Sequence, residues 1–565
     1  MPALATSTAP STSLPLFAER VLTDPYPAYD ALRRTGAAVH LDEYGVWAVA
    51  RHADIAAVLK APEIFGSDNG IALTALANQD VIAGSVFASD GTRHSRLRDV
   101  LAPHLALRAM RFLVTRITDR ADGLVAAYTQ SGRCDAVALA RHMVCDTVME
   151  LMGLPSGDRE ALLAGSAAVF DVFGPYGSRY QQALPLASRM AQVLRDTLTR
   201  ETAEPGSWTS AVFAAVDAGR IDEADAIPLV CAYTVAAIDT TVLGLADCIV
   251  QLARHPRQWQ ILRGDPLRWS VPAFHEALRL EAPIQGYGRL LTRAADIGGV
   301  HLDEGEQVWL LYGSAGRDPH RWGDDADEYN IRRYRNHEHL AFGGGPHLCA
   351  GIPLAELQAR AVLRALAARC THLTLDGEPA RALNNLLRGY REAWIAVELS
   401  PPHLRSRHRL FAGMSAGSPV MILATLTPGA GTALLSGPAP GPRTQQVGPG
   451  WEVLLMPEPL ARSVLATIAG TAAESAVGWV FAHGGAWGIF LPALSDDPAW
   501  PSGTTYLKAG GHVTLPPLTW RFTEGDRTSG WVDLNRDLFS RPLLLHPIVT
   551  LLARDATCPS PVPEP

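Results

Sequence analysis

The stretch Phe342-Gly343-Gly344-Gly345-Pro346-His347-Leu348-Cys349-Ala350-Gly351 decides the fold of this 565-residue chain. It places one cysteine between a glycine-rich turn and the start of a predicted helix. The glycines let the backbone approach a ligand closely and point N–H groups at the sulfur. Most lone cysteines are small buried core residues, but a core role does not require a phenylalanine, three glycines and a histidine at fixed offsets. The pattern therefore predicts that the Cys349 thiolate is a metal ligand.

The order F-G-x-G-x-H-x-C-x-G-x-x-L-A, completed by Leu354 and Ala355, resembles the haem-binding signature of the cytochrome P-450 monooxygenases. The resemblance implies heme b (iron protoporphyrin IX) with Cys349 as the axial iron ligand, and a thiolate in that position favours O–O bond cleavage. In the family, the residue matching Phe342 covers the sulfur side of the haem and the residue matching His347 meets a propionate. The loop residues that the resemblance assigns to cofactor binding are Phe342, Gly343, His347, Cys349 and Gly351.

The periodicity of the first 400 residues predicts a mainly α fold with small β-sheets, similar to the cytochrome P-450 fold. Apolar residues at three- and four-residue spacing predict helices over Ala161–Phe173, Leu186–Glu201, Asp222–Leu252 and Ala350–Cys370. Short extended pieces are expected at Ala38–Leu41, Val46–Ala50, Ile297–Leu302 and Val308–Tyr312. We assign residues 16–400 to the haem domain, after a disordered lead at 1–15 that is rich in Ser, Thr and Pro.

An E-x-x-R pair, Glu276 and Arg279, lies upstream of Cys349. Side chains three residues apart share a helix face and can pair, which by itself is a common surface feature. The resembled family joins such a pair to the arginine four residues after an aromatic residue, which Tyr329 matches. The third member is therefore Arg333 rather than its neighbour at 332. We expect these three residues to form a structural network on the cysteine side of the haem.

The segment Ala236-Ala237-Ile238-Asp239-Thr240-Thr241 resembles the oxygen-activation segment of the same family, A/G-G-x-D/E-T. A threonine hydroxyl inside a helix can bond to a carbonyl one turn earlier, and an acid beside it can relay protons. We predict Thr240 as the distal hydroxyl and Asp239 as the proton relay, both catalytic. Ala237 replaces the usual glycine, and its methyl group narrows the groove. The alternative is a hydrogen-bonded Asp–Thr pair in an ordinary core.

Three further basic residues are expected around the haem propionates. His94 and Arg98 are four residues apart, so one helix face carries both, and half-buried carboxylates need such charge-assisted donors. The family places H-x-x-x-R in the helix that crosses the haem. Arg289, after Pro283-Ile284-Gln285-Gly286-Tyr287-Gly288, resembles its third propionate ligand. Read alone, each of these residues would more often be a solvated surface group.

Composition narrows the class of protein. Hydrophobic residues make up 47% and charged residues 19% of the chain, which predicts a large core. The net charge of −8 argues against a nucleic-acid binder. The seven cysteines are odd in number and form no C-x-x-C pair, so neither a zinc site nor a disulfide framework is indicated. With no signal-peptide pattern and no run of about twenty apolar residues, we expect a cytoplasmic protein without a membrane span.

The composition changes at Ser400-Pro401-Pro402. Residues 401–450, with Gly, Pro and Ser clusters, predict a linker leading into a second domain. The Trp-rich, strand-like pattern over 451–553 predicts a smaller accessory α/β domain, and residues 554–565 read as a Pro-rich tail.

Parts of this second domain faintly resemble actinobacterial primase/polymerase-like proteins. Asp496 and Asp497 are adjacent, so on a strand they face opposite sides and cannot hold catalytic metals together. We therefore expect a catalytically inactive domain that binds a protein partner or has a regulatory role.

Together these features predict a haem-thiolate monooxygenase that inserts one oxygen atom from O₂ into an organic substrate. The sequence contains no flavin or iron–sulfur motif, so electrons must come from a partner. The resemblance implies a ferredoxin with an NAD(P)H-dependent ferredoxin reductase, and Arg332, Arg333 and Arg335 could dock an acidic ferredoxin. Two alternatives stay open: an enzyme forming C–C or C–O bonds on a biosynthetic intermediate, and a haem-based sensor that signals through the C-terminal domain.

The substrate class follows from what the expected pocket lacks. The stretches Tyr44–Arg51, Phe173–Pro175 and Asn384–Gly389 resemble family members that oxidise para-substituted benzoates. Such enzymes need a cationic or hydroxyl-rich clamp, yet the expected pocket segment between Lys60 and Arg93 contains no Lys or Arg. Burying an unpaired carboxylate costs on the order of several kcal/mol. We therefore expect a neutral or basic aromatic or natural-product substrate.

Overall fold

The computed structural model describes residues 10–110, 113–154, 159–401, 442–447 and 451–468, with shorter stretches between 477 and 553. The chain divides into two compact units, Met1–His408 and Arg409–Pro565. Each unit is described by itself.

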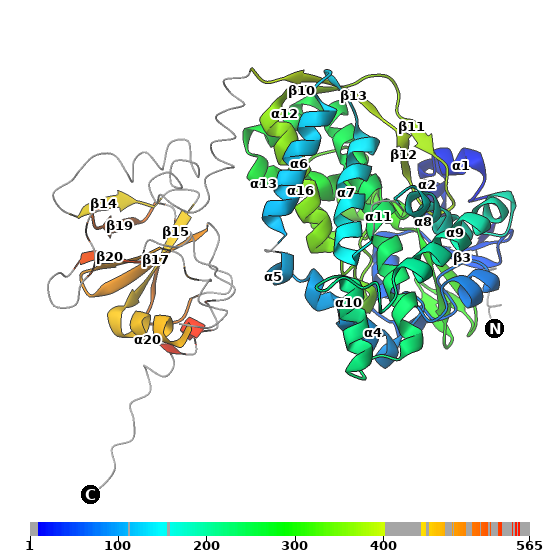
Figure 1. The fold of residues 1–565 in the computed structure, drawn as a ribbon, viewed down its shortest axis with the longest axis horizontal. Coiled ribbons are helices and arrows are strands. Elements are labelled where there is room, and N and C mark those ends of the chain that lie inside the picture. The colour runs from blue at the N-terminus through cyan, green and yellow to red at the C-terminus, as the bar shows by residue number, and fades with distance from the viewer. Residues whose placement is uncertain are drawn as a thin grey trace, which may run out of the picture. The chain divides into compact units, whose positions relative to one another are not determined.

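The first unit is mainly helical, and within it α7 packs against α11 and α6 packs against α16 (Figure 1). The helices are α1 (Glu19–Thr23), α2 (Tyr26–Thr35), α3 (His52–Leu59), α4 (Gly91–Leu105), α5 (Leu107–Met110), α6 (Val114–Tyr128), α7 (Ala136–Met152), α8 (Arg159–Val172), α9 (Ser178–Thr197), α10 (Trp208–Asp217), α11 (Glu223–Arg254), α12 (Pro256–Gly264), α13 (Pro266–Leu280), α14 (Tyr312–Ala315), α15 (Pro319–Trp322) and α16 (Ile352–Arg369). Single turns of other helix types lie at η1 (Ala77–Val81), η3 (Asn336–Glu338) and η4 (Gly345–His347).

Small sheets complete the first unit. The largest has the order β1-β2-β3-β9-β6-β4, the next has the order β10-β13-β5, and β7-β8 and β11-β12 are hairpins. The strands are β1 (Ser11–Thr12), β2 (Val39–Leu41), β3 (Val46–Val49), β4 (Phe65–Gly66), β5 (Arg133–Asp135), β6 (Tyr287–Leu291), β7 (Ala295–Ile297), β8 (Val300–Leu302), β9 (Gln307–Leu310), β10 (Cys370–Leu375), β11 (Ala380–Ala382), β12 (Gly389–Glu392) and β13 (Trp394–Leu399).

Helix α11 is the central helix of this unit and packs against α7, α8, α10 and α13. Its first turn is fixed by a capping box, in which the side chains of Asp222 and Asp225 each accept a backbone N–H. Among the described residues, α11 alone is long and apolar enough to cross a membrane. However, 78% of its most apolar window is buried inside the protein. This burial identifies α11 as a core helix, since helices that are apolar on every side occur in the centre of large domains.

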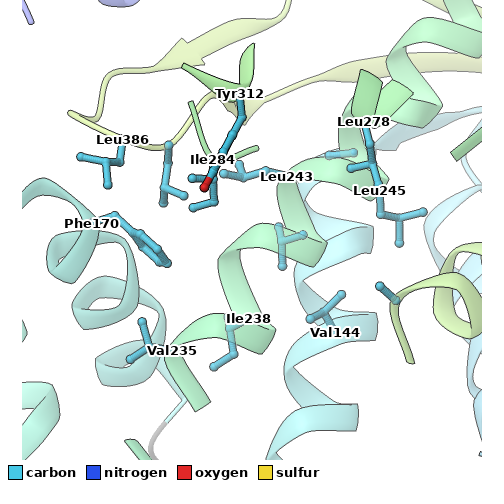
Figure 2. Close-up of a cluster of buried hydrophobic side chains, with 14 of the residues drawn as sticks. Val144, Phe170, Val235, Ile238, Leu243, Leu245, Leu278, Ile284, Tyr312 and Leu386 are labelled. Carbon is cyan, nitrogen blue, oxygen red and sulfur yellow. The ribbon is translucent and has the colours of Figure 1, made fainter. Parts of the chain in front are cut away.

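The apolar contacts around α11 fix its position in the core. Figure 2 shows Val235 and Ile238 of α11 in one cluster with Phe170 of α8 and Val144 of α7. All four side chains are buried. Because burying each such side chain stabilises the fold by about 1.5–3 kcal/mol, the rotation of α11 about its axis is set by this cluster. That rotation decides which residues of the helix face the neighbouring cavity.

The predicted elements agree with the observed ones except at two places. Helix α9 begins at Ser178, eight residues before the expected start, and includes Pro185. The single strand expected over Ile297–Leu302 is instead the β7–β8 hairpin. Gly298 and Gly299 adopt φ values of 54° and 86°, and two consecutive residues with positive φ form the tight turn of a hairpin.

The expected lead at residues 1–15 is corrected at its C-terminal end. Ser11 and Thr12 form β1, which pairs in parallel with β2. Backbone hydrogen bonds from His40 to Pro10 and from Asp42 to Thr12 continue this pairing. The backbone of a segment rich in Ser, Thr and Pro can still donate and accept inter-strand hydrogen bonds at the edge of a sheet. Residues 1–9 lie outside the described residues.

In the second unit, the described strands form an antiparallel sheet with the order β18-β15-β17-β16-β20, and β14 pairs with β19. The elements are β14 (Arg443–Gln446), β15 (Trp451–Pro457), α20 (Glu458–Ile468), β16 (Val480–His483), β17 (Ala486–Pro492), β18 (Thr505–Leu507), β19 (His512–Leu515) and β20 (Ser529–Asp533). Residues 402–441, Asp496, Asp497 and the tail at 554–565 lie outside the described residues. The linker and the limits of an accessory domain therefore stay predictions.

Candidate active site

The loop before α16 holds Cys349 in a closed turn. The backbone N–H of Cys349 donates to the carbonyl of Phe342 at 2.9 Å. Gly345 has a φ of 62°, and a Cβ atom there would lie 2.1 Å from the carbonyl oxygen of Leu59, so no other residue fits. Gly343 also has a positive φ, of 69°. Gly343 and Gly345 of the sequence pattern are therefore favoured by the shape of the loop.

The sulfur of Cys349 is exposed, but to an internal cavity that the residue lines. Burial raises the pKa of the thiol, whereas backbone N–H groups of Gly351 and Ile352 and the charge of Arg98 act to lower it. N–H groups at a helix start favour the thiolate. This environment suits a sulfur that is deprotonated when it ligates a metal.

A cluster of basic side chains lines one edge of the same cavity, namely His94, Arg98, Arg289 and His347. Arg289 is only 5% exposed, and no carboxylate pairs with it among the described residues. The buried Nε2 atom of His94 has no hydrogen-bond partner in the described part of the chain. Burial, His347 and Arg98 lower the pKa of His94 to about 4. Buried cations without partners are costly, so this edge is built to receive an anionic ligand.

Two residues that the sequence analysis missed hold His347. Its Nε2 lies 3.1 Å from Ser67 Oγ and 3.4 Å from Asp90 Oδ1. Asp90 in turn accepts the backbone N–H of Ser67 at 2.7 Å. Both residues lie about 250 or more positions before His347, and no local pattern marks them. The position of Asp90 directly before α4 is the one available signal, and it suggests a helix cap rather than a histidine partner.

The structure brings together Glu276, Arg279 and Arg333, none of which lines the cavity. Arg279 donates from Nε and Nη2 to the two oxygens of Glu276 at 3.0 and 2.9 Å, and Arg333 Nε donates to Glu276 Oε1 at 2.9 Å. Arg279 Nη1 also donates to the carbonyls of Gly316 and Ala326 at 2.5 and 2.6 Å. Glu276 and Arg279 have no exposed surface. Every charge is paired, which is the condition for a buried ion network to stabilise a fold.

Helix α11 contributes Ala236, Ala237, Thr240 and Thr241 to the cavity lining. The hydroxyl of Thr240 donates to the carbonyl of Ala236 at 2.6 Å, as expected for a threonine inside a helix. Asp239 does not line the cavity. It is 7% exposed, and its Oδ2 has no hydrogen-bond partner among the described residues. Burial raises the pKa of Asp239 to about 6, although a hydrogen bond with Ser166 on α8 acts to lower it.

The cavity contains about 1440 Å³ of atom-free space, including its mouth. The walls away from the basic edge are mainly apolar, with Ile71, Val86, Phe87, Trp208, Tyr233 and Ile284. None of these residues was singled out from the sequence, because they come from four separate segments.

A b-type haem fits this set of residues. The cavity-facing thiol can supply an iron ligand, and the basic edge, in which the buried His94 Nε2 has no partner among the described residues, can supply partners for two carboxylates. The small side chains Ala236 and Ala237 leave room for a flat ring. Thiolate ligation and paired anionic groups are the demands that a haem makes on such a site.

Comparisons with known proteins point to the same group. The family model "Cytochrome P450" matches residues 272–388. The chain is 34% identical over 396 residues to cytochrome P450 CYP199A2 of Rhodopseudomonas palustris, covering 69% of this chain and 95% of that protein. It is 31% identical to the cytochrome P450 monooxygenase PikC of Streptomyces venezuelae, covering 68% of this chain and 94% of that protein. The crystal structure of CalO2 aligns with a TM-score of 0.59 and 26% identity, covering 68% of this chain and 98% of that one.

The chain therefore belongs to the cytochrome P450 family. It is a P450 monooxygenase, and its cofactor is heme b with iron. Its relatives include bacterial enzymes named for natural products, among them the erythromycin C-12 hydroxylase of Saccharopolyspora erythraea at 31% identity.

Proposed function

We propose that this enzyme hydroxylates a neutral aromatic or natural-product substrate that binds between the haem and α11. The observation that carries this proposal is the distribution of charge in the cavity. All of its basic side chains lie at the propionate edge, namely His94, Arg98, Arg289 and His347. The segment between Lys60 and Arg93 contributes Ile71, Val86 and Phe87 to the lining, all apolar. A substrate carboxylate would remain unpaired there, at a cost on the order of several kcal/mol.

The chain's own residues hold the reacting groups in position and transfer protons. The haem supplies the oxygen chemistry, and the thiolate of Cys349 favours O–O bond cleavage. Thr240 faces the cavity, and its hydroxyl is held by the carbonyl of Ala236. We assign the distal hydroxyl to Thr240. Asp239 serves as the proton relay by exchanging protons near its pKa of about 6, after turning toward the cavity from its place beside Ser166.

Four basic residues hold the two propionates in this proposal. Arg289 and His94 are buried and unpartnered by acids, so they offer charge-assisted donors at little cost in side-chain entropy. Arg98 is already oriented by donating to the carbonyl of Leu348. Binding two carboxylates here raises the pKa of His94, since an anion favours the imidazolium form.

We further propose a ferredoxin as electron donor, reduced by an NAD(P)H-dependent reductase. Arg332 and Arg335 are exposed close to the Cys349 loop in sequence and offer a basic surface. Arg333 does not share this role, because its guanidinium is buried in the Glu276 network. A cytoplasmic location fits such a donor. A partner-binding role for the accessory region at 451–553 remains a proposal of the sequence pattern.

Matched pairs of ligands, each an acid and its methyl ester, test the substrate class. A series of para-substituted benzoates and their methyl esters is titrated into the ferric holoenzyme, and the spin-state change of the haem spectrum gives each Kd. We expect each ester to bind at least tenfold more tightly than its acid, since about 1.4 kcal/mol is tenfold in Kd. Tighter binding of the acids would reject the proposal. Turnover of the best ester with a ferredoxin and its reductase then tests hydroxylation.

A further inference from the structure

A chain of hydrogen bonds runs from the surface of α16 to the backbone just before the Cys349 loop. His275 Nε2 lies 2.8 Å from Glu356 Oε1, and His275 Nδ1 lies 3.1 Å from His339 Nε2. The backbone N–H of Ala341 donates to His339 Nδ1 at 3.2 Å. Three separate parts of the sequence meet here, namely α13, the residues after η3, and α16.

The donors and acceptors in this chain permit one arrangement of protons. An amide N–H can only donate, so His339 Nδ1 must accept and its Nε2 must carry the proton. His275 Nδ1 then accepts from His339, and the Nε2–H of His275 donates to the carboxylate of Glu356. Both imidazoles are neutral in this arrangement. Burial, His275, Arg279 and His337 hold the pKa of His339 well below its usual range, in agreement with a neutral ring.

The two rings also support a wall of the cavity. The ring centroid of Phe342 lies 5.3 Å from that of His339 and 5.7 Å from that of His275, the latter edge-on. His275 and His339 are 6% and 4% exposed, whereas the side chain of Glu356 is 23% exposed. Glu356 is connected to the Cys349 loop through two imidazoles that are shielded from water, where hydrogen bonds are electrostatically stronger. A change of charge at Glu356 therefore affects the loop.

We propose that Glu356, His275 and His339 form a hydrogen-bonded relay that positions the Cys349 loop and carries the charge of the Glu356 carboxylate toward the haem. Glu356 and the Ala341 amide together fix the tautomer of each imidazole. The loop then keeps the geometry in which Phe342 lines the cavity and Cys349 points into it. These three residues are positioning residues, since none of them lines the cavity.

One pair of variants tests the hydrogen-bonded path. His275→Gln keeps an acceptor for His339 and a donor for Glu356, whereas His275→Phe keeps an aromatic ring and removes both. Hydrogen–deuterium exchange of the Ala341 amide is measured in each ferric holoprotein. We expect exchange at least tenfold faster in His275→Phe than in His275→Gln, as the loss of one hydrogen bond of about 1.4 kcal/mol implies. Equal exchange in the two variants would overturn the relay.

A second pair tests the charge. Glu356→Gln keeps an acceptor oxygen and removes the negative charge, so we expect a more positive ferric–ferrous midpoint potential with unchanged Ala341 exchange. Glu398→Gln is the control, because Glu398 forms an exposed pair with His372 at 2.9 Å, on strands outside the cavity lining. A potential that responds equally in both variants, or in neither, would reject the relay.

These readouts do not depend on the substrate, so their outcome is independent of the proposed function. If His275→Phe does not fold, Glu356→Leu replaces it. Glu356→Leu removes the acceptor of the His275 Nε2–H. It is compared with Glu356→Gln by the same exchange measurement.

Discussion

Two buried sets of charged side chains lie outside the cavity lining, the Glu276 network and Asp239, and they differ in how completely they are paired. In the network, Glu276 and Arg279 are fully buried, and each of their charged groups is paired. Asp239 of α11 is also buried, but one carboxylate oxygen has no partner among the described residues. Full pairing makes the network rigid, whereas an incompletely paired group can change its protonation and orientation. The difference separates a fully paired ion network from a carboxyl group with one oxygen unpaired among the described residues.

The strongest way to break this comparison is to remove the iron ligand. Cys349→Ser replaces the thiolate with a poor ligand in the same closed loop, so we expect turnover to fall below detection. The absorption spectrum of the haem protein and the haem-to-protein ratio measure the loss. A spectrum and turnover like those of the parent would contradict the assignment of Cys349.

Breaking the paired network should cost stability before it alters chemistry. Glu276→Gln leaves the buried Arg279 without a carboxylate, while Arg333 keeps its pair with Asp325. Removing one partner of a buried ion pair costs about 3–5 kcal/mol. Denaturant unfolding measures this free energy. Glu378→Gln is the control, since the pair between Arg254 and Glu378 is at the surface with Glu378 89% exposed. That pair contributes about 0–1 kcal/mol. Similar losses in both variants would refute the contribution of the buried network to stability.

Changing α11 where it lines the cavity should alter chemistry with the fold intact. Thr240→Ala removes the hydroxyl in the cavity, and we expect product formation to fall roughly 10²-fold while haem binding stays unchanged. Thr234→Ala is the matched control, because Thr234 makes the same bond to the carbonyl of Val230 at 2.8 Å but does not line the cavity. Product formation per NAD(P)H is the measurement. Unchanged product in Thr240→Ala would remove Thr240 from the mechanism.

The raised pKa of Asp239 makes the free energy of unfolding depend on pH. Its folded pKa, about 6, is raised above the ordinary value of 3.8, so the folded state favours the protonated acid. The penalty on stability appears as pH rises from about 4 through 6 and is full above that range. Asp239→Asn should therefore raise the free energy of unfolding by on the order of 2–3 kcal/mol at pH 8 and by nearly nothing at pH 3.5. Thermal unfolding across this pH range is the measurement, and a gain independent of pH would contradict the raised pKa.

The smallest expected effect concerns Ala237. Ala237→Gly removes the methyl group beside Thr240, and glycine in a helix interior costs about 1 kcal/mol relative to alanine. We expect a small fall in the midpoint of thermal unfolding together with more product per NAD(P)H, because the groove beside Thr240 widens. Product yield equal to that of the parent would show that the methyl group does not restrict the site.

The sequence predicts the residues whose partners are close along the chain or whose spacing is fixed. The Cys349 loop, the bond from Thr240 to Ala236, the Glu276–Arg279 pair and the limits of α11 are of this kind, since helix periodicity and turn geometry act over a few residues. Long-range partners leave no such mark. Ser67 and Asp90 hold His347 across about 250 residues, and the relay from Glu356 to Ala341 joins three segments.

The sequence by itself determined the turn that carries Cys349, the glycines that shape this turn and the helix that contributes Thr240 to the cavity, because each depends on local geometry. The tertiary structure decided which side chains of that helix face the cavity. Val235 and Ile238 pack against α7 and α8 and thereby turn Thr240 toward the cavity and Asp239 away from it. The rotation of a helix is set by the burial of its apolar side chains against neighbours distant in sequence. No pattern of spacing along one segment contains those neighbours.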